Sequence, residues 1–162
     1  MSLFRSACLA LPLLLLPVLS LAQGAQIAFG SVKQDATLPV EVTADNLAVN
    51  QKDGTAIFTG GVLIGQGEMR LSAARVLVVY REDDERIERL EATGGVTLVS
   101  GKDAAESETA NYNIDTGQIE MLGNVLLLQG KNALTAERMT VDTKSGTARM
   151  DGRVKTILQP KE

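Results

Sequence analysis

The chain contains no histidine and no tryptophan, and its single cysteine, Cys8, lies close to the N-terminus. The lack of histidine excludes His-dependent catalytic triads, and zinc and copper lose their usual nitrogen and sulfur ligands. Carboxylates remain and suit hard cations, but the sequence has no EF-hand spacing. A lone cysteine forms no disulfide within the chain, so burial and hydrogen bonding must hold the fold. We expect neither a metal site nor a cofactor.

Aromatic residues and positive charge are also scarce. The sequence has three phenylalanines and two tyrosines, and its net charge is −4 at pH 7. A negative chain repels polyanions, and few side chains are available for bases or sugar rings to stack on. These features argue against a nucleic-acid-binding protein and against a lectin.

Residues 1–22 have the features of a cleavable signal peptide. Arg5 precedes an apolar run over residues 7–21, and the small residues Ser20 and Ala22 predict cleavage before Gln23. The alternative is an uncleaved anchor, but prolines interrupt the run and it is shorter than the ~20 apolar residues that a spanning helix needs. The sequence therefore predicts export, with Cys8 removed.

Residues 23–37 lack strong periodicity, and we interpret them as a flexible lead-in to an ordered domain over residues 38–160. Within this domain, four segments at residues 58–62, 92–96, 121–125 and 150–154 read FTGGV, ATGGV, MLGNV and MDGRV. Each lies where apolar and polar residues alternate, as in strands with one buried face. Their spacing of about 30 residues indicates stacked units. The sequence predicts an all-β fold of tandem strand-turn-strand repeats.

The apolar positions slip by one residue at equivalent places in three of the repeats. The first slip runs from Val42 and Ala44 to Leu47 and Val49, and the others lie within residues 71–78 and 134–141. A slip would normally turn half of the strand outward. Because it recurs, we interpret it as a bulge that keeps both halves facing one interior. Glycines within the inward rows, such as Gly60, would allow a sharp bend there.

One triplet, Asp115-Thr116-Gly117, matches the aspartic-protease motif, in which two carboxylates share a proton. Here it lies in a predicted hairpin turn, where Asp and Gly are common for conformational reasons. The inward rows contain few polar residues that could meet at a catalytic centre. We therefore expect no catalytic residues and no enzymatic activity.

The order and spacing of several motifs resemble the LptA/OstA-like family, the periplasmic bridge proteins of lipopolysaccharide transport in Gram-negative bacteria. The motifs are PVEVTAD at 39–45, FTGGV at 58–62 followed by GQG at 65–67, YNI at 112–114 and LGNV at 122–125. The resemblance covers about residues 38–160. It implies a periplasmic, open-ended antiparallel β-jelly-roll that carries lipid through an apolar groove.

The resemblance also implies partners and a lipid-binding surface. The partners are lipopolysaccharide through its lipid A, an LptC-like jelly-roll protein anchored in the inner membrane, the N-terminal domain of an LptD-like outer-membrane translocon, and further copies of the chain joined head to tail. The alternative is a structural scaffold or adhesin whose inward rows fill a dry core. The residues expected to contact lipid are Val40, Val42, Phe58, Leu98, Tyr112, Ile114 and Leu127.

The two ends of the predicted stack are candidate docking edges, because a sheet edge carries unpaired N–H and C=O groups that invite another strand. By family analogy, the first edge faces the inner-membrane partner and the second the outer-membrane partner. The alternative is that Pro39, Pro160 and the charged C-terminus block these edges. The candidate residues are Val40, Glu41 and Val42 at one end, and Val154, Lys155, Thr156, Ile157 and Leu158 at the other.

Overall fold

The computed structural model describes residues 25–30 and 37–159, so the predicted signal peptide at residues 1–22 lies outside the described residues. The regular elements of these residues are all β-strands, and the 11 strands form one sheet. This part of the chain contains no helix that could cross a membrane. The strands are β1 (Ala25–Ala28), β2 (Glu41–Thr43), β3 (Asn46–Asn50), β4 (Thr55–Gln66), β5 (Met69–Tyr80), β6 (Ile87–Ser100), β7 (Asp103–Asn113), β8 (Gln118–Gln129), β9 (Asn132–Asp142), β10 (Thr147–Asp151) and β11 (Lys155–Ile157).

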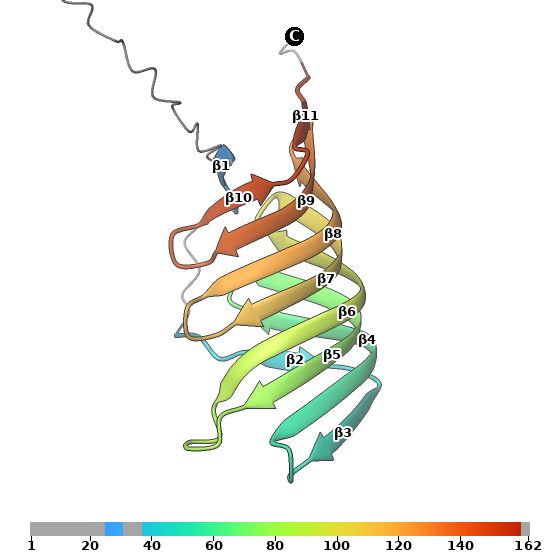
Figure 1. Cartoon of the computed structure of the whole chain (residues 1–162), viewed down its shortest axis with the longest axis vertical. Coiled ribbons are helices and arrows are strands. Elements are labelled where there is room, and N and C mark those ends of the chain that lie inside the picture. Colours follow the sequence, from blue (N-terminus) through green and yellow to red (C-terminus); the bar gives the residue numbers. More distant parts are fainter. Residues whose placement is uncertain (1–24, 31–36, 160–162) are drawn as a thin grey trace, which may run out of the picture.

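The strands are stacked almost in the order of the sequence (Figure 1). From β4 to β10 each strand pairs antiparallel with the next along the chain. At the first end, both β2 and β3 pair with β4. At the second end, both β10 and β11 pair with β9, and β1 adds to β10. The prediction of an all-β fold of tandem strand-turn-strand units is confirmed.

Each ladder between β4 and β9 shifts register near its middle. In the β4–β5 ladder the shift lies between Thr59 and Val62, and in the β8–β9 ladder it lies between Leu122 and Val125. At these points Gly60 has a φ of +83° and Gly123 a φ of +84°, a backbone conformation that glycine adopts without steric strain. The bulges that the sequence predicts therefore lie where the long strands bend.

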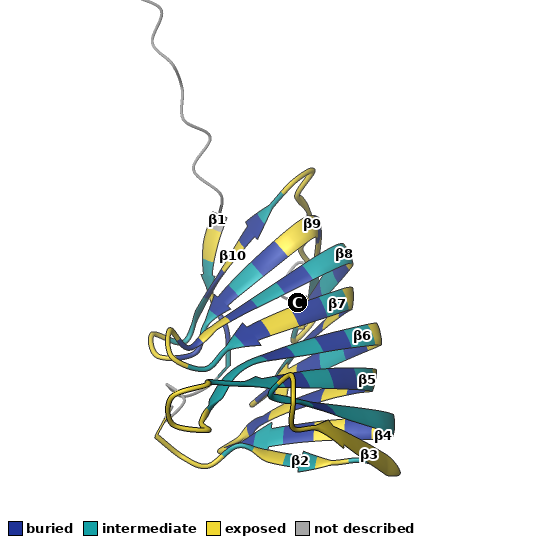
Figure 2. Ribbon diagram, turned by 60° about the horizontal axis from the view of Figure 1, so that its bottom comes forward, coloured by how far each residue is buried: buried dark blue, intermediate teal, exposed yellow. Residues whose placement is uncertain are grey.

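The bends fold the sheet over on itself into two facing layers. The first layer contains β1, β3 and β10, the second contains β2 and β11, and β4 to β9 contribute one half to each layer. We call the side opposite the bends the mouth, because there the turns of one layer approach the turns of the other. Buried side chains alternate with exposed ones along each long strand (Figure 2), so the apolar rows face the interior between the layers.

Part of the expected lead-in is ordered. Ala25–Ala28 forms β1, which pairs with β10 from Met150 to Thr147, and Phe29 is only 3% exposed. The prediction of a flexible segment over residues 23–37 is therefore wrong for this part; residues 23–24 and 31–36 lie outside the described residues. β1 has four residues, which is too short for a periodic pattern to predict a strand. Its partner, β10, lies near the other end of the chain.

Candidate functional site

The interior is lined by apolar rows that run across the whole sheet, because directly paired residues of neighbouring strands lie on the same face. The ladders form several such rows, and one row from each layer extends from the first end of the stack to the second. The second-layer row contains Val42, Ile64, Leu71, Leu98, Ala105, Leu127, Leu134 and Thr156. The first-layer row contains Val49, Ala56, Val78, Leu90, Tyr112, Ile119, Val141, Ala148 and Ile27.

The seven residues predicted to contact lipid fall into two groups. Leu98, Leu127 and Tyr112 lie in the middle of these rows and are at most 1% exposed. The others are partly buried and pack against the core, and they are Val40, Val42, Phe58 and Ile114. Leu98 and Leu127 share the second-layer row through Ala105. In this conformation the layers enclose the middle of the interior, while its margins are partly accessible.

One polar contact joins the two layers across the interior. The Tyr112 hydroxyl, from the first layer, donates a hydrogen bond to Oε1 of Gln66 at the end of β4 in the second layer, at 2.5 Å. Gln66 Nε2 in turn donates to the carbonyl of Leu38 at 2.9 Å. Gln66 is 2% exposed, and sequence reasoning missed it. Its position two residues after Ile64 continues the inward alternation, and that signal could have identified it.

Burial raises the pKa of the Tyr112 phenol more than the neighbouring Thr143 hydroxyl lowers it. An unfolded chain ionises tyrosine near its ordinary pKa of about 10, whereas the folded protein keeps this proton to higher pH. The stability that this group contributes is therefore fully present below about pH 10 and is lost as the pH rises through the raised pKa.

We expect Tyr112→Phe to lower the free energy of unfolding at neutral pH by about 1 kcal/mol, because the hydrogen bond to Gln66 is lost. The variant should also lose less stability than the unsubstituted protein above about pH 10, since no phenol at this position can ionise. Urea unfolding at neutral pH and from about pH 9 to 11 measures both effects. Identical alkaline slopes for the two proteins would contradict an enclosed Tyr112.

Residues 28–30 cross the mouth near the second end of the stack. The Phe29 amide donates to the carbonyl of Gly146 in a first-layer turn, at 3.0 Å. On the second-layer side, the Gly30 amide donates to Asp103 Oδ2 at 2.8 Å, and Gln129 Nε2 donates to the Ala28 carbonyl at 2.7 Å. These bonds tie both layers together through the N-terminal segment, and they place Phe29 over the interior.

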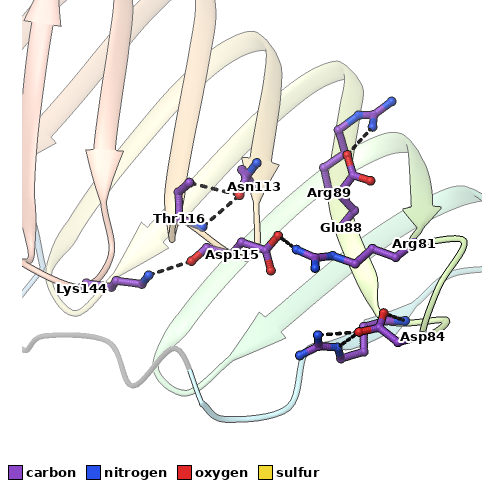
Figure 3. Close-up of polar contacts among 9 residues, drawn as sticks. Arg81, Asp84, Glu88, Arg89, Asn113, Asp115, Thr116 and Lys144 are labelled. Carbon is purple, nitrogen blue, oxygen red and sulfur yellow. Dashed lines mark hydrogen bonds and ion pairs between the residues drawn. The ribbon is translucent and has the colours of Figure 1, made fainter.

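The first-layer turns are connected by ion pairs and hydrogen bonds (Figure 3). Asp115 forms an ion pair with Arg81 through its carboxylate, and Lys144 Nζ donates to its carbonyl at 2.7 Å. Asn113 Oδ1 accepts from the Thr116 amide at 2.9 Å, which is the side-chain geometry of a turn. The Asp-Thr-Gly triplet thus lies in the expected hairpin turn. In the described part of the chain, no group of three or more acidic side chains is placed to hold a metal ion.

Both predicted docking edges lie at the ends of the second layer. There β2 contains Glu41 and Val42, and β11 runs from Lys155 to Ile157; within residues 25–30 and 37–159, β2 pairs only with β4 and β11 only with β9. Exposed apolar side chains surround both edges. They are Leu38, Leu47, Val49 and Leu63 at the first end, and Val154, Ile157 and Leu158 at the second. Val49 of β3, which the slipped apolar phase predicts to face the interior, belongs to an interior row but is 62% exposed.

The fold is similar to that of LptH from Pseudomonas aeruginosa, a structure described as the LptA-homologous periplasmic component of the lipopolysaccharide transport device. The TM-score is 0.69 at 19% sequence identity, over 78% of this chain and 99% of that chain. An uncharacterised protein of Rhizobium meliloti (strain 1021) is 30% identical over 109 residues, which is 63% of this chain. The match spans 59% of that relative's length.

A family model described as "LptA/(LptD N-terminal domain) LPS transport protein" matches residues 41–147, more than half of the chain. The chain belongs to this family. The matched region of this LptA/LptD N-terminal family member begins at the first residue of β2 and ends at the first residue of β10. It therefore includes all of β2 to β9, the strands that form most of both layers.

Proposed function

We propose that this protein carries lipopolysaccharide across the periplasm, with the acyl chains of lipid A between the two layers. Membership of the lipopolysaccharide-transport family is the observation that carries the proposal. The end-to-end apolar rows supply a suitable path, since each CH₂ group removed from water contributes about 0.8 kcal/mol. Several acyl chains would otherwise face an exposure cost of tens of kcal/mol, so transfer requires a continuous apolar surface.

Lipid enters by separation of the layers along the mouth. The Tyr112–Gln66 hydrogen bond and the contacts of residues 28–30 connect the layers on this side. The bends on the opposite side are continuous backbone, so they act as the hinge. The open first end, where Val42 and Phe58 are only partly buried, is the side from which acyl chains reach the interior.

The two ends of the stack dock neighbouring jelly-roll domains by strand addition. The β2 edge receives the LptC-like inner-membrane partner, and the β11 edge joins a further copy of the chain or the LptD-like outer-membrane domain. Each free edge strand offers unpaired backbone groups for antiparallel pairing. Pairing at both ends would continue the apolar rows from one domain into the next and produce one uninterrupted path.

Photo-crosslinking in living cells tests the lipid path. A photoreactive residue at Val42 or Ile114 should yield lipopolysaccharide adducts, because both side chains pack against the interior. The same residue at Glu41 is the matched control, since Glu41 is exposed and points to the opposite face of β2. Equal labelling at Val42 and Glu41, or adducts at neither Val42 nor Ile114, would contradict lipid carriage and favour a scaffold with a dry core.

A further inference from the structure

The two ends of the stack differ in shape. At the first end β2 and β3 both pair with β4, so the two layers end on the same strand. At the second end β10 and β11 both pair with β9, but β1 lies on β10 and leaves β11 uncovered. The first layer is therefore one strand longer than the second. An even edge formed by β2 and β3 of a second copy cannot pair with both parts of this stepped edge at once.

The bends at the two ends are equivalent. The Asp45 amide donates to the Gly60 carbonyl, and the Glu137 amide donates to the Gly152 carbonyl, each at 3.0 Å. Gly60 and Gly152 also occupy the same place in their sequence repeats. In both bends the glycine carbonyl faces the preceding strand, so the free edge of β10–β11 corresponds to the edge that β4 presents to β5.

This equivalence fixes the register of a docked copy, in which β3 would pair with β10. The same positions of β10 are already taken by β1. In the docked copy, Leu47, Ala48, Val49 and Asn50 would lie opposite Met150, Arg149, Ala148 and Thr147, as Val76, Leu77, Val78 and Val79 of β5 lie opposite Phe58, Ile57, Ala56 and Thr55 of β4. In the single chain, Ala25, Gln26, Ile27 and Ala28 occupy those four places.

The inward side chains of β1 and β3 also correspond. Ile27 is partly buried and covers Ala148, which is 1% exposed. Val49 covers Ala56 in the same way on one side, but none of the described strands lies beyond β3, and Val49 is 62% exposed. A docked Val49 would take the place of Ile27 and bury its own apolar surface, while β2 would gain β11 as a partner.

We propose that β1 is an exchangeable cap on the β10 edge, and that β3 of a second copy displaces it during head-to-tail docking. The inference rests on the docking described under the proposed function. Exchange replaces a four-residue strand by a five-residue strand and adds the three-residue pairing of β2 with β11. Withdrawal of β1 also removes Phe29 from the mouth, so docking opens the interior at the junction between copies.

A reversible crosslink between β1 and β10 tests this exchange. Gln26 and Arg149 are paired, and both are exposed, so Gln26→Cys with Arg149→Cys places two cysteines at a distance that a disulfide can span. Residues 23–162 contain no other cysteine. In sedimentation velocity over a concentration series, the reduced form should associate and the oxidised form should remain monomeric. Each single-cysteine variant controls for the substitutions.

Two further variants separate failure of the cap from failure of docking. Ile27→Asp should release β1 and shift association to at least tenfold lower concentration, because the carboxylate is unfavourable over the apolar core. Val49→Asp should prevent association, because it places a carboxylate on the apolar face of the incoming β3 strand.

If the oxidised and reduced forms associate equally, β1 is not a cap although docking stands. If no form associates, including Ile27→Asp, both the cap and head-to-tail self-docking are wrong, while lipid adducts at Val42 test carriage independently.

Discussion

Leu98→Asp is expected to lower the free energy of unfolding by about 4–5 kcal/mol. Leu98 is fully buried in the second-layer row, so its replacement places a carboxyl group among apolar side chains without a polar partner. Domains of this size are stable by only about 5–15 kcal/mol, so much of the population would unfold under mild denaturant. Urea unfolding followed by circular dichroism measures the change.

The adjacent residue supplies the matched control. Val99 points to the opposite face of β6 and is 38% exposed, so Val99→Asp adds the same charge to the same strand at the surface. We expect a change of about 0.5 kcal/mol or less. Similar losses in the two variants would show that the interior near Leu98 is open to water rather than enclosed by the layers.

Gly123→Ala is expected to destabilise the protein by about 4 kcal/mol, because two effects add at this bend. The residue has a φ of +84°, and such a backbone conformation costs a residue with a Cβ roughly 1–3 kcal/mol. A Cβ would also lie 2.6 Å from Glu108 Oε2 and 2.9 Å from Glu108 Cβ. Forcing these groups apart adds about 1–3 kcal/mol of overpacking strain.

Gly95→Ala isolates the backbone contribution. Gly95 has a φ of +83° in the corresponding bend of β6, but apart from the glycine and its two chain neighbours no heavy atom lies within 4 Å of the place of its Cβ. We expect a loss of about 2 kcal/mol, half of that at Gly123. Thermal unfolding of both variants provides the comparison. Equal losses would mean that the approach of Glu108 to the backbone does not limit the residue at position 123.

Much of this fold could be predicted from local sequence patterns. Alternation identifies the buried face of each long strand. The bends are indicated by the phase slips at residues 42–49, 71–78 and 134–141, and by the glycine motifs of the strands that keep their phase. The repeats also make neighbours in sequence neighbours in the sheet, so the strand order follows without long-range information. In the second layer, the end strands β2 and β11 lie where the sequence predicts the ends of the stack, whereas β1, which ends the first layer beyond β10, was not predicted.

The remaining features depend on contacts between distant segments. β1 pairs with β10 across more than 100 residues, and four residues of mixed polarity give no periodic signal. The Tyr112–Gln66 bond requires knowledge of which half of β4 faces which half of β7. For the candidate site, alternation identifies inward positions such as Leu98 and Val42, but only the three-dimensional arrangement distinguishes the enclosed middle from the accessible margin.

The ladder of nearly identical hairpins has a consequence for how a bound molecule would move. An aliphatic group displaced along the second-layer row from Ile64 to Leu71 or Leu98 meets another aliphatic residue of similar volume at each step, and the smaller Ala105 then precedes Leu127. Successive positions then offer nearly equal dispersion and desolvation energies. Such a lining has no deep free-energy minimum for a bound acyl chain. Under the proposed function, the entry of each new lipid molecule would therefore suffice to move the bound molecules along the row.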